Sequence, residues 1–553
     1  MRKQAAQYNS KATEQVAEFI DGLATTSLTA NGTFDSAAAN DFMGEYASKS
    51  GATVPPKLQA VLDEMPEGKK DRVIKGLMDG IQSYESQHGV APTADVIEAA
   101  IHQAFSTTEQ ARIKYSLDSA SNSHSDTLSL QPNRAVIAIT AAIAEAIPVA
   151  NYLSADIGSN QAKLIIVSHQ AASLYGGYAV NDIMDGINSG RAYINSGRTH
   201  SLTRTVNTFA DLITSVQTNS ETCNQGAAAV KLMRGRTNIY VNGFLAGREV
   251  SNNGVAATSA VSGSITISGT TYTLSGTVNV DTGAVSITTD TPLPAGTKVV
   301  AEGFIDFERS NGSIPFIGTT ATTYDLYANP WKVNTEQTID TRTQFANELG
   351  LDPAAESMLA IRNQFANERH YNVLQKASRI AANATRTFDF AWATQGLQKT
   401  RAQIWQDFAA VLNAASQQMA EDTIDHGITH LYVGKTMVAN LMTADREIFE
   451  PSGITARPSI YRVGRLFGLY EVYYNPQATD APTASTILCI GRSTQVARNP
   501  FVLGDAVPPT IIPLTATRDQ VSGAGFYARN FTAVNPHAPS AAGCALINAI
   551  NLA

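Results

Sequence analysis

The stretch that decides the fold begins at Gly350 and reads Gly-Leu-Asp-Pro-Ala-Ala-Glu-Ser-Met-Leu-Ala-Ile-Arg-Asn-Gln-Phe-Ala-Asn-Glu-Arg. It predicts a helix from Asp352 to about Ala381, because Asp352 can cap the first amides and Pro353 needs no N–H there. Apolar residues then recur on one face of the helix at positions Met358, Ile361, Phe365, Val373, Ala377 and Ile380. At about 1.5 Å per residue this helix is about 45 Å long, which is typical of a brace for a flat or extended structure. An ordinary core helix of an α-rich enzyme is the alternative interpretation.

Composition excludes several classes of protein. The chain has 553 residues and a formal net charge of −8, so it is not a basic nucleic-acid-binding protein. A negative net charge is compatible with a protein shell that encloses nucleic acid without binding it tightly. Cys223, Cys489 and Cys544 lie far apart and form no CxxC pattern, so they indicate single thiols and neither a disulfide framework nor a zinc site.

The sequence predicts no membrane association. Its first residues lack the apolar core of a secretory signal. The longest apolar run, Ala135 to Ala150, contains Glu145 and Pro148 and is shorter than a bilayer span. We therefore expect a soluble protein made in the cytosol.

Residues 1 to about 105 predict four short amphipathic helices. The first two carry narrow apolar stripes made of Val16, Phe19, Ile20 and Leu23, and of Leu58, Val61, Leu62 and Met65. Such helices form either a small bundle or an arm that lies on neighbouring subunits. Because four of them bury only a small core by themselves, we expect an arm that docks on neighbours.

The amino-acid composition and the hydrophobic pattern change twice in the middle of the chain. The stretch 173–205 is rich in Gly, Ser and Asn yet carries Tyr175, Tyr178, Tyr193 and Ile194, which predicts an extended hairpin that contacts another subunit. Alternating strands and Gly/Pro turns from 208 to 325, with a turn at Asp281-Thr282-Gly283, predict a separable β-sandwich or small barrel. With the helical first part and a mixed C-terminal part, the fold class is α+β with an inserted all-β domain.

No catalytic motif outweighs its structural interpretation. Gly434-Lys435-Thr436 suggests a phosphate loop, but Thr429 stands where the motif needs its first glycine, so a strand-to-helix turn is favoured. Asp422, Asp425, His426 and His430 are close in sequence, but Gly427 ends the helix between the two histidines and argues against a metal site. We expect no catalytic residue, metal or cofactor.

The order of elements brings in a resemblance. The segment Val333 to Leu359, with Gly-Leu-Asp leading into a helix that opens with Ala and Glu, resembles the entry to the spine helix of tailed-phage major capsid proteins, notably the T-even-type myovirus family. Further correspondences are Asp407–Glu421 with Thr429–Val433, Gly464–Pro476 with Ile487–Arg492, and Asp505–Pro513 with Tyr527–Phe531 and Asn535-Pro536. The likeness covers about residues 130 to 553. Asp425-His426-Gly427 departs from the family pattern, and residues 1–105 have no counterpart.

The resemblance implies the Hong Kong 97-type capsid fold. Its implied parts are an N-terminal helical arm (1–110), the start of the peripheral domain (111–167), the extended loop (168–207), the inserted domain (208–325), the peripheral domain with the spine helix (326–385), the axial domain (386–512) and closing peripheral strands (513–553). Met358, Ile361, Phe365, Val373 and Ile380 would form the packed face of the spine helix.

The resemblance also implies a function without catalysis. The chain would self-assemble as hexamers and pentamers into an icosahedral shell, the virion capsid, enclosing double-stranded DNA held without sequence preference. Decoration, portal or scaffold proteins are further implied partners. The alternatives are an encapsulin-like nanocompartment shell, a β-rich phage tail or receptor-binding protein, and a multidomain enzyme.

Overall fold

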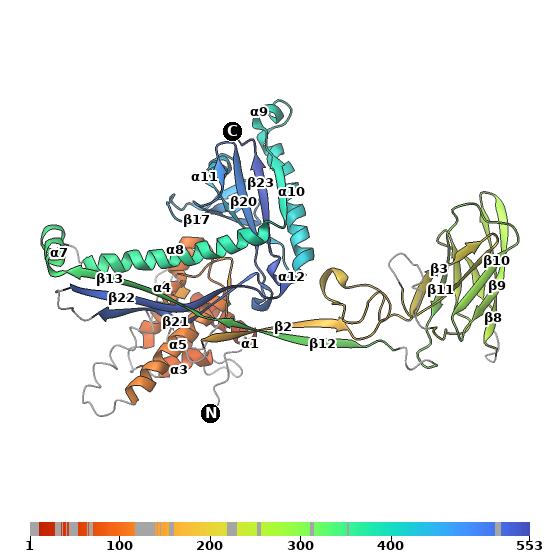
Figure 1. The fold of residues 1–553 in the computed structure, drawn as a ribbon, viewed down its shortest axis with the longest axis horizontal. Helices are drawn as coiled ribbons and strands as arrows, with labels where there is room; N and C mark the ends of the chain where they lie inside the picture. Colours follow the sequence, from red (N-terminus) through yellow and green to blue (C-terminus); the bar gives the residue numbers. More distant parts are fainter. Residues whose placement is uncertain are drawn as a thin grey trace. The chain divides into compact units, whose positions relative to one another are not determined.

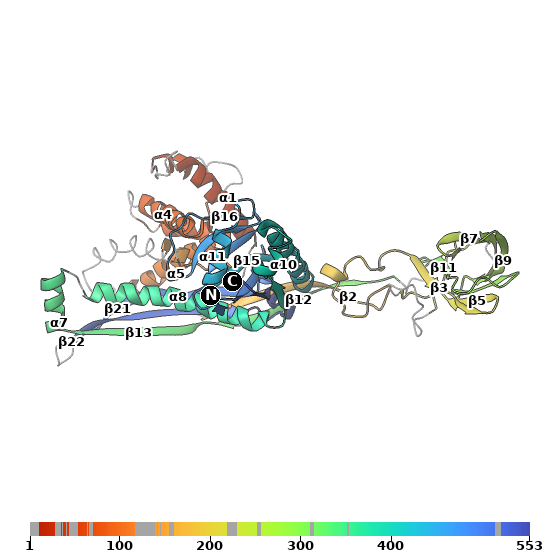
Figure 2. The same ribbon diagram turned by 90° about the horizontal axis from the view of Figure 1, so that it is seen from above.

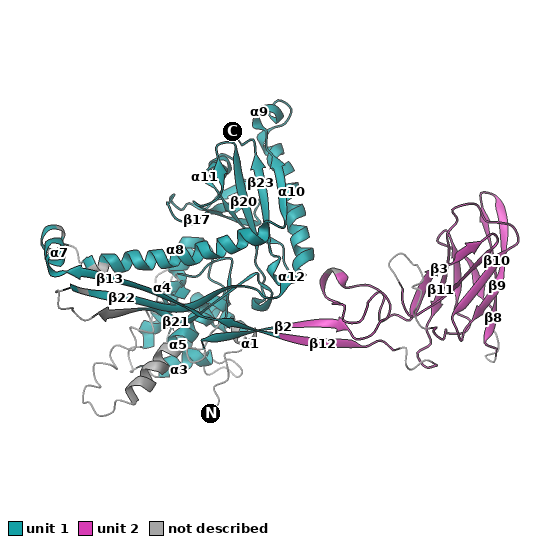
Figure 3. Cartoon of the chain, viewed as in Figure 1, with its two compact units in different colours: residues 1–166, 323–553 teal, residues 167–322 magenta. Residues whose placement is uncertain are grey.

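The computed structural model describes residues 10–27, 35, 37–39, 41–43, 54–63, 65, 70–116, 139–140, 142–143, 145–153, 160–217, 229–250, 256–309, 314–350, 353–514 and 521–552. The predicted cap Asp352 and Cys223 lie outside these residues. The chain forms two compact units, drawn in Figure 3: unit 1 comprises Met1–Ile166 and Thr323–Ala553, and unit 2 comprises Val167–Thr322.

The longest helix, α8, organises unit 1. It spans Pro353–Ala381, as predicted, and follows a short turn made of α7 (Ile339–Gln344) and η3 (Phe345–Leu349). Figures 1 and 2 show α8 running along a long, narrow sheet. The strand order of that sheet is β1 (Asn151–Tyr152), β21 (Phe501–Leu514), β22 (Val521–Val534) and β13 (Asn329–Thr338).

The second sheet of unit 1 has eight strands. Its order is β14 (Thr385–Asp389), β23 (Cys544–Ile550), β20 (Ala484–Gly491), β15 (Ile428–Val433), β18 (Tyr470–Tyr474), β17 (Tyr461–Leu466) and β16 (Phe449–Pro451), with β19 (Asp480–Ala481) beside β20. The helical elements near it are α9 (Trp392–Gln395), α10 (Arg401–Thr423), α11 (Lys435–Met442), η4 (Val496–Arg498) and α12 (Ala538–Ala541). Thr400 and Gln403 form a capping box that starts α10 six residues before the predicted Asp407.

Strand β20 shows how this sheet is buried on both faces. Its alternate residues enter two different cores, with Ile487 and Cys489 against α10 and Leu488 and Ile490 on the opposite face. A strand covered on both sides is continuously apolar, and Ser485-Thr-Ile-Leu-Cys-Ile-Gly is close to that pattern. Something must therefore cover the second face.

The N-terminal helices cover it. They are α1 (Ser10–Ser27), α3 (Pro56–Asp63), α4 (Lys70–His88) and α5 (Ala94–Ser116). Their apolar stripes join one continuous core with Val373, Leu374 and Ala377 of α8 and with Leu488 and Ile490. Both predicted stripes are thus already buried within the chain, which removes the reason for expecting an arm that docks on neighbours. The period of 3.6 identifies a covered face and does not identify what covers it.

The C-terminal segment also differs from the expectation. Residues 513–553 were expected to be closing strands of the peripheral domain, but β23 lies inside the eight-stranded sheet between β14 and β20. Strand β21, which lies against β22, already begins at Phe501, within the expected axial domain. Strand β23 alternates buried and partly exposed residues, so its apolar side completes the core that β20 begins.

Unit 2 contains a nine-stranded sheet that closes on itself. Its order is β3 (Gly197–Ser201), β11 (Val299–Phe304), β6 (Asn238–Val241), β7 (Phe244–Glu249), β8 (Thr258–Ile267), β9 (Thr270–Asn279), β10 (Ala284–Thr289), β5 (Thr208–Leu212) and β4 (Thr203–Thr205). Only Leu202 separates β3 from β4, so the first and last strands form one chain segment and the sheet is a barrel. The interior is filled by apolar side chains, including Phe209, Ile239 and Val278. The predicted turn at Asp281-Thr282-Gly283 joins β9 to β10, with Gly283 at φ +79°.

The expected extended loop, 168–207, is divided differently in the structure. Its last residues form β3 and β4 of the barrel. Its first residues belong to β2 (Gln161–Ala171), which forms a two-stranded sheet with β12 (Ile317–Tyr327). Between them lie β-bridges and the short η1 (Gly186–Asn188). The extended element is therefore a ribbon whose two strands are far apart in sequence, a pairing that no local pattern reveals.

Candidate assembly surfaces

The phosphate-loop interpretation fails at the start of α11. The Asp480 carboxylate accepts hydrogen bonds from the Thr436 backbone N–H and hydroxyl, each at 3.0 Å. A Cβ atom on Gly434 would lie 2.7 Å from the same carboxyl carbon. Gly434 is thus required for a close approach by Asp480, and the protein's own carboxylate occupies the position at the helix N-terminus that a phosphate would take.

The histidines near the end of α10 do not form a metal site. His430 lies in β15, where its Nδ1 is 2.7 Å from the Thr429 hydroxyl, while His426 lies beside Asp425 at 3.5 Å. Among the described residues, no group of three or more His, Cys, Asp or Glu side chains is placed to hold a metal ion. Burial raises the pKa of the Cys489 and Cys544 thiols, as expected of inert packing.

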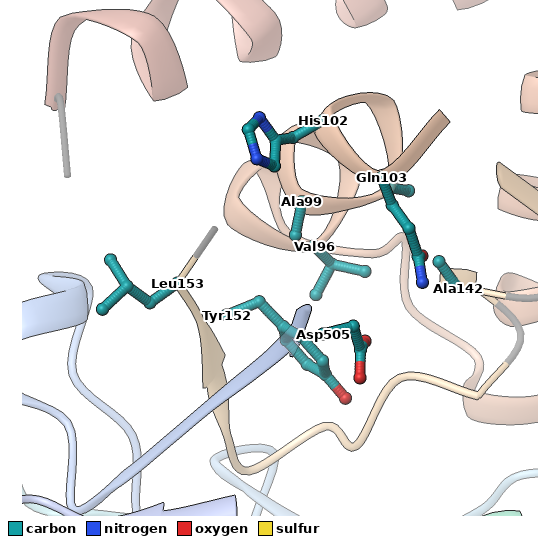
Figure 4. Close-up of a pocket in the computed structure, with 9 residues that line it drawn as sticks. Val96, Ala99, His102, Gln103, Ala142, Tyr152, Leu153 and Asp505 are labelled. Carbon is teal, nitrogen blue, oxygen red and sulfur yellow. The ribbon is translucent and has the colours of Figure 1, made fainter. Parts of the chain in front are cut away.

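One hollow in the described part of the chain is nearly enclosed, and another is open to solvent. The enclosed one has a volume of about 10 Å³, room for one water molecule at most. Figure 4 shows it between α5 and β21; it is lined by Val96, Ala99, Ala100, His102, Gln103, Ala142, Tyr152, Leu153 and Asp505. A second hollow of about 270 Å³ is open to solvent beside Phe388, Lys399 and Asp407. In the second hollow the two charged side chains are already paired, because Lys399 Nζ lies 2.6 Å from the Asp407 carboxylate.

The predicted face of α8 packs on two surfaces. Ile361 and Phe365 lie against the long sheet, whereas Val373, Ala377 and Ile380 lie against the core that contains the N-terminal helices. Phe365 lies 5.1 Å from Trp331 of β13 and 5.3 Å from Phe526 of β22, measured between ring centroids. Met358 and Val373 are also buried, whereas Ile361 and Ile380 are partly buried at the margins. This aromatic contact fixes the first half of the helix on the sheet.

A buried ion pair fixes the middle of α8. Arg369, which interrupts the apolar stripe in sequence, is 3% exposed, and its Nη2 lies 2.8 Å from the Asp505 Oδ1 of β21. Tyr152 lies beneath the guanidinium, 5.7 Å from its ring centroid. Burial raises the pKa of nearby Glu145 to about 7, an effect that Arg369 partly opposes. The pairing explains an arginine on a packed face.

A second set of polar contacts ties the N-terminal helices to the body. Arg492, just after β20, donates to the Asn151 carboxamide at 2.9 Å and to the Thr93 hydroxyl at 2.6 Å. Its Nη2 also lies 3.3 Å from Asp95 at the start of α5, and Asp95 in turn accepts from the Tyr152 backbone N–H. Nothing in the local sequence around Arg492 signals this role.

The ribbon of β2 and β12 exposes apolar residues. Ile317 and Phe316 are 52% and 66% exposed, and Val167 on the other strand is 47% exposed. Ser168 and Thr320 contact through their hydroxyls at 3.0 Å, and Gln161 donates to Asp325 at 3.2 Å. A two-stranded ribbon is at best marginally stable by itself, so this is the part of the described chain that most needs a partner surface.

The residues predicted to contact a neighbouring subunit divide into two groups. Tyr175, Tyr178 and Tyr193 are each at most 3% exposed, and their rings pack edge to face within the core of unit 2. They are core residues, contrary to the expectation. Ile194 is 76% exposed and is the only one of the four free to meet another molecule. The Gly- and Asn-rich sequence around the tyrosines suggested an unpacked segment, although their rings form a small aromatic core.

No described helix combines the length and apolar character needed to cross a lipid bilayer. The sequence matches no family model and no curated protein.

Solved structures do show similarity. The chain aligns with the capsid of the jumbo bacteriophage PhiKZ at a TM-score of 0.35 and 9% identity, covering 73% of this chain and 91% of that one. It aligns with a structure from Mycobacterium phage Che8 at 0.29 and 9%, covering 53% and 84%. For the SrpI encapsulin complex of Synechococcus elongatus PCC 7942 the values are 0.27 and 10%, covering 43% and 79%.

Proposed function

We propose that this chain is a major capsid protein, the structural subunit of an icosahedral phage shell of the Hong Kong 97 type. The observation that carries the proposal is a set of three elements. Unit 1 has a 29-residue helix laid along a long sheet and an eight-stranded sheet, and the β2–β12 ribbon has exposed apolar residues that lie in unit 2. Exposed apolar residues on a two-stranded ribbon suit a subunit that contacts its neighbours in a wall.

The elements map onto the parts of such a subunit as follows. Helix α8 with β13, β22 and β21 would be the spine helix and the peripheral domain, and the eight-stranded sheet with α10 and α11 would be the axial domain. The β2–β12 ribbon would be the extended loop, and the barrel would be an insertion carried beyond it. Copies would join as hexamers and pentamers, and the finished virion shell would hold double-stranded DNA.

Interior contacts with DNA would be weak and independent of sequence. With a net charge of −8 the chain has few groups to spare for neutralising phosphates, so shell formation would not need nucleic acid. A nanocompartment shell would form equally well without DNA, so nucleic acid extracted from native particles separates the two kinds of shell.

The test is assembly of the purified full chain, followed by sedimentation and negative-stain imaging. We expect rings or closed shells. Ile317→Asp, on the exposed face of the ribbon, should keep the thermal melting temperature of the soluble chain and reduce assembled particles at least tenfold, because a desolvated carboxylate would enter the contact. Thr322→Asp, an exposed polar position on the opposite face of the same strand, is the matched control and should cost much less. A chain that stays monomeric under all assembly conditions would contradict the proposal.

A further inference from the structure

Three histidines meet where the N-terminal helices contact the body of unit 1. His88 is the last residue of α4, His370 lies on α8 and His430 lies on β15. Tyrosines surround them: the ring centroid of His88 is 4.3 Å from Tyr84 and 5.9 Å from Tyr473. His430 is also 5.9 Å from Tyr473. Three elements from distant parts of the chain thus place imidazoles in one largely aromatic contact.

The hydrogen bonds of these rings suit neutral imidazoles. His370 Nε2 lies 3.0 Å from the Tyr432 hydroxyl, and His88 Nδ1 lies 3.4 Å from the Tyr473 hydroxyl. Hydroxyl groups can donate to or accept from a neutral ring, but they do not compensate a full positive charge away from water. The site therefore satisfies the uncharged form.

The charged groups facing the rings would oppose protonation. Arg462 of β17 faces His88, and Arg492 faces His430. The carboxylates at hand are already engaged: Glu471 binds Arg462 at 2.5 Å and Arg465 at 2.6 Å, and Asp95 binds Arg492. A proton on any of the three rings would add a positive charge next to existing ones.

The pKa values follow the same direction. Burial, reinforced by Arg462, lowers the pKa of His88 to about 4. Burial likewise lowers the pKa of His370 and of His430 to about 3, with Arg492 contributing at His430. The C-terminal end of α4 favours a positive His88, but this effect is smaller than the desolvation that lowers its pKa. All three are neutral at pH 7.

We propose that His88, His370 and His430 form an acid-released latch. They hold α4, and with it the N-terminal helices, on the eight-stranded sheet near neutral pH, and they free this helical layer when they take up protons. The proposal concerns the single chain and does not depend on shell assembly, so either can fail without the other.

The sign of the pH dependence follows from linkage. A solvent-exposed histidine has a pKa of 6.5, so the undocked state binds more protons than the docked state below that value. The latch is therefore fully closed above about pH 6.5 and weakens as the pH falls toward 4. Each histidine lowers the docked-to-undocked ratio by up to about tenfold per pH unit in this window.

The experiment is hydrogen exchange of the full chain from pH 7.5 to 4.5, corrected for intrinsic rates. We expect Lys70–His88 to lose protection at a higher pH than the barrel hairpin Thr258–Asn279. The triple substitution H88Q/H370Q/H430Q should keep α4 protected at least one pH unit lower. His169→Gln, an exposed histidine in unit 2 paired with Asp185, is the matched control and should change nothing.

Two results would overturn the latch. One is simultaneous loss of protection in α4 and in the barrel hairpin, which would indicate general acid unfolding. The other is an unchanged α4 midpoint in a triple variant that is folded at pH 7.5. If the variant does not fold, exchange of the histidine C2 hydrogens in the unmodified chain gives each titration directly. Normal midpoints near pH 6.5 for all three histidines would then refute the proposal.

Discussion

The N-terminal helices and the β2–β12 ribbon look alike in sequence, because each carries apolar residues that a short element cannot bury by itself. In both cases the sequence predicts a covering surface without identifying it. The structure treats them differently. Helix α4 buries Val73, Ile74 and Leu77 against the chain's own body, whereas the ribbon leaves Phe316 and Ile317 more than half exposed. Periodicity shows that a face will be covered. Only the three-dimensional arrangement shows whether the cover is intramolecular, and so which element is available to a second molecule.

The largest effect should come from a charge on the covered side of this comparison. Leu77→Asp places an unpaired carboxylate at a position with 0% exposure, so we expect unit 1 to lose more than about 4 kcal/mol and to melt below room temperature or fail to fold. All three tryptophans lie in unit 1, so their fluorescence reports its melting. Leu397→Asp, at an 87% exposed leucine, should melt like the unmodified chain. A stable Leu77→Asp chain would mean that the helices are, after all, an undocked arm.

A smaller loss should follow from cutting the polar tie between the helices and the body. Arg492→Ala leaves Asp95 without its cation in a nearly buried site, which costs about 3 kcal/mol. Urea unfolding followed by tryptophan fluorescence measures it. The exposed Arg446 provides the control, and Arg446→Ala should stay within about 0.5 kcal/mol. Equal losses for the two variants would show that packing alone holds the helices.

The smallest effect should come from removing most of unit 2. Replacing Ser173–Pro315 by Asn-Gly should keep the ribbon, because Ala172 donates to the Phe316 carbonyl at 2.9 Å and a two-residue turn can then close that pair. Unit 1 should change by less than about 1 kcal/mol in the same urea assay. A cut at 208–325, the boundary that the sequence suggests, removes most of β12 and should be less well tolerated. Loss of unit 1 in the variant that lacks Ser173–Pro315 would refute independent folding of the two units.

Short-range sequence patterns correctly predicted the helices and hairpins whose formation depends mainly on neighbouring residues. The spine-like helix followed from a proline start and a 3.6-residue stripe, and the β9–β10 hairpin followed from alternation around Gly283. The α+β class and an inserted β-domain followed from the succession of such elements. For the candidate surface, sequence indicated an extended element near residue 170 but chose the wrong residues within it, since three of its four predicted contacts are core tyrosines.

Long-range pairings account for what was missed. Strand β2 pairs with β12, which follows about 150 residues later. Strand β23 pairs with β20 after the chain has passed through β21 and β22 of the four-stranded sheet. Asp480 fills the helix N-terminus at Thr436 from 44 residues away, and Asp505 balances Arg369 across 136 residues. In each case the partner is chosen by the fold as a whole, so neither residue signals the contact in its own neighbourhood.

The closure of the barrel through β3 and β4 has a consequence for crowding. Strand edges with unpaired amides and carbonyls are templates for pairing with other sheets, and they lead to aggregation when many copies are held close together. In a shell, every subunit would bring one such domain near those of its neighbours. Because the segment from Gly197 to Thr205 pairs with β11 at one end and β5 at the other, little edge is left to recruit a foreign strand. The barrel can therefore be displayed repeatedly at high local concentration and stay separate from its copies.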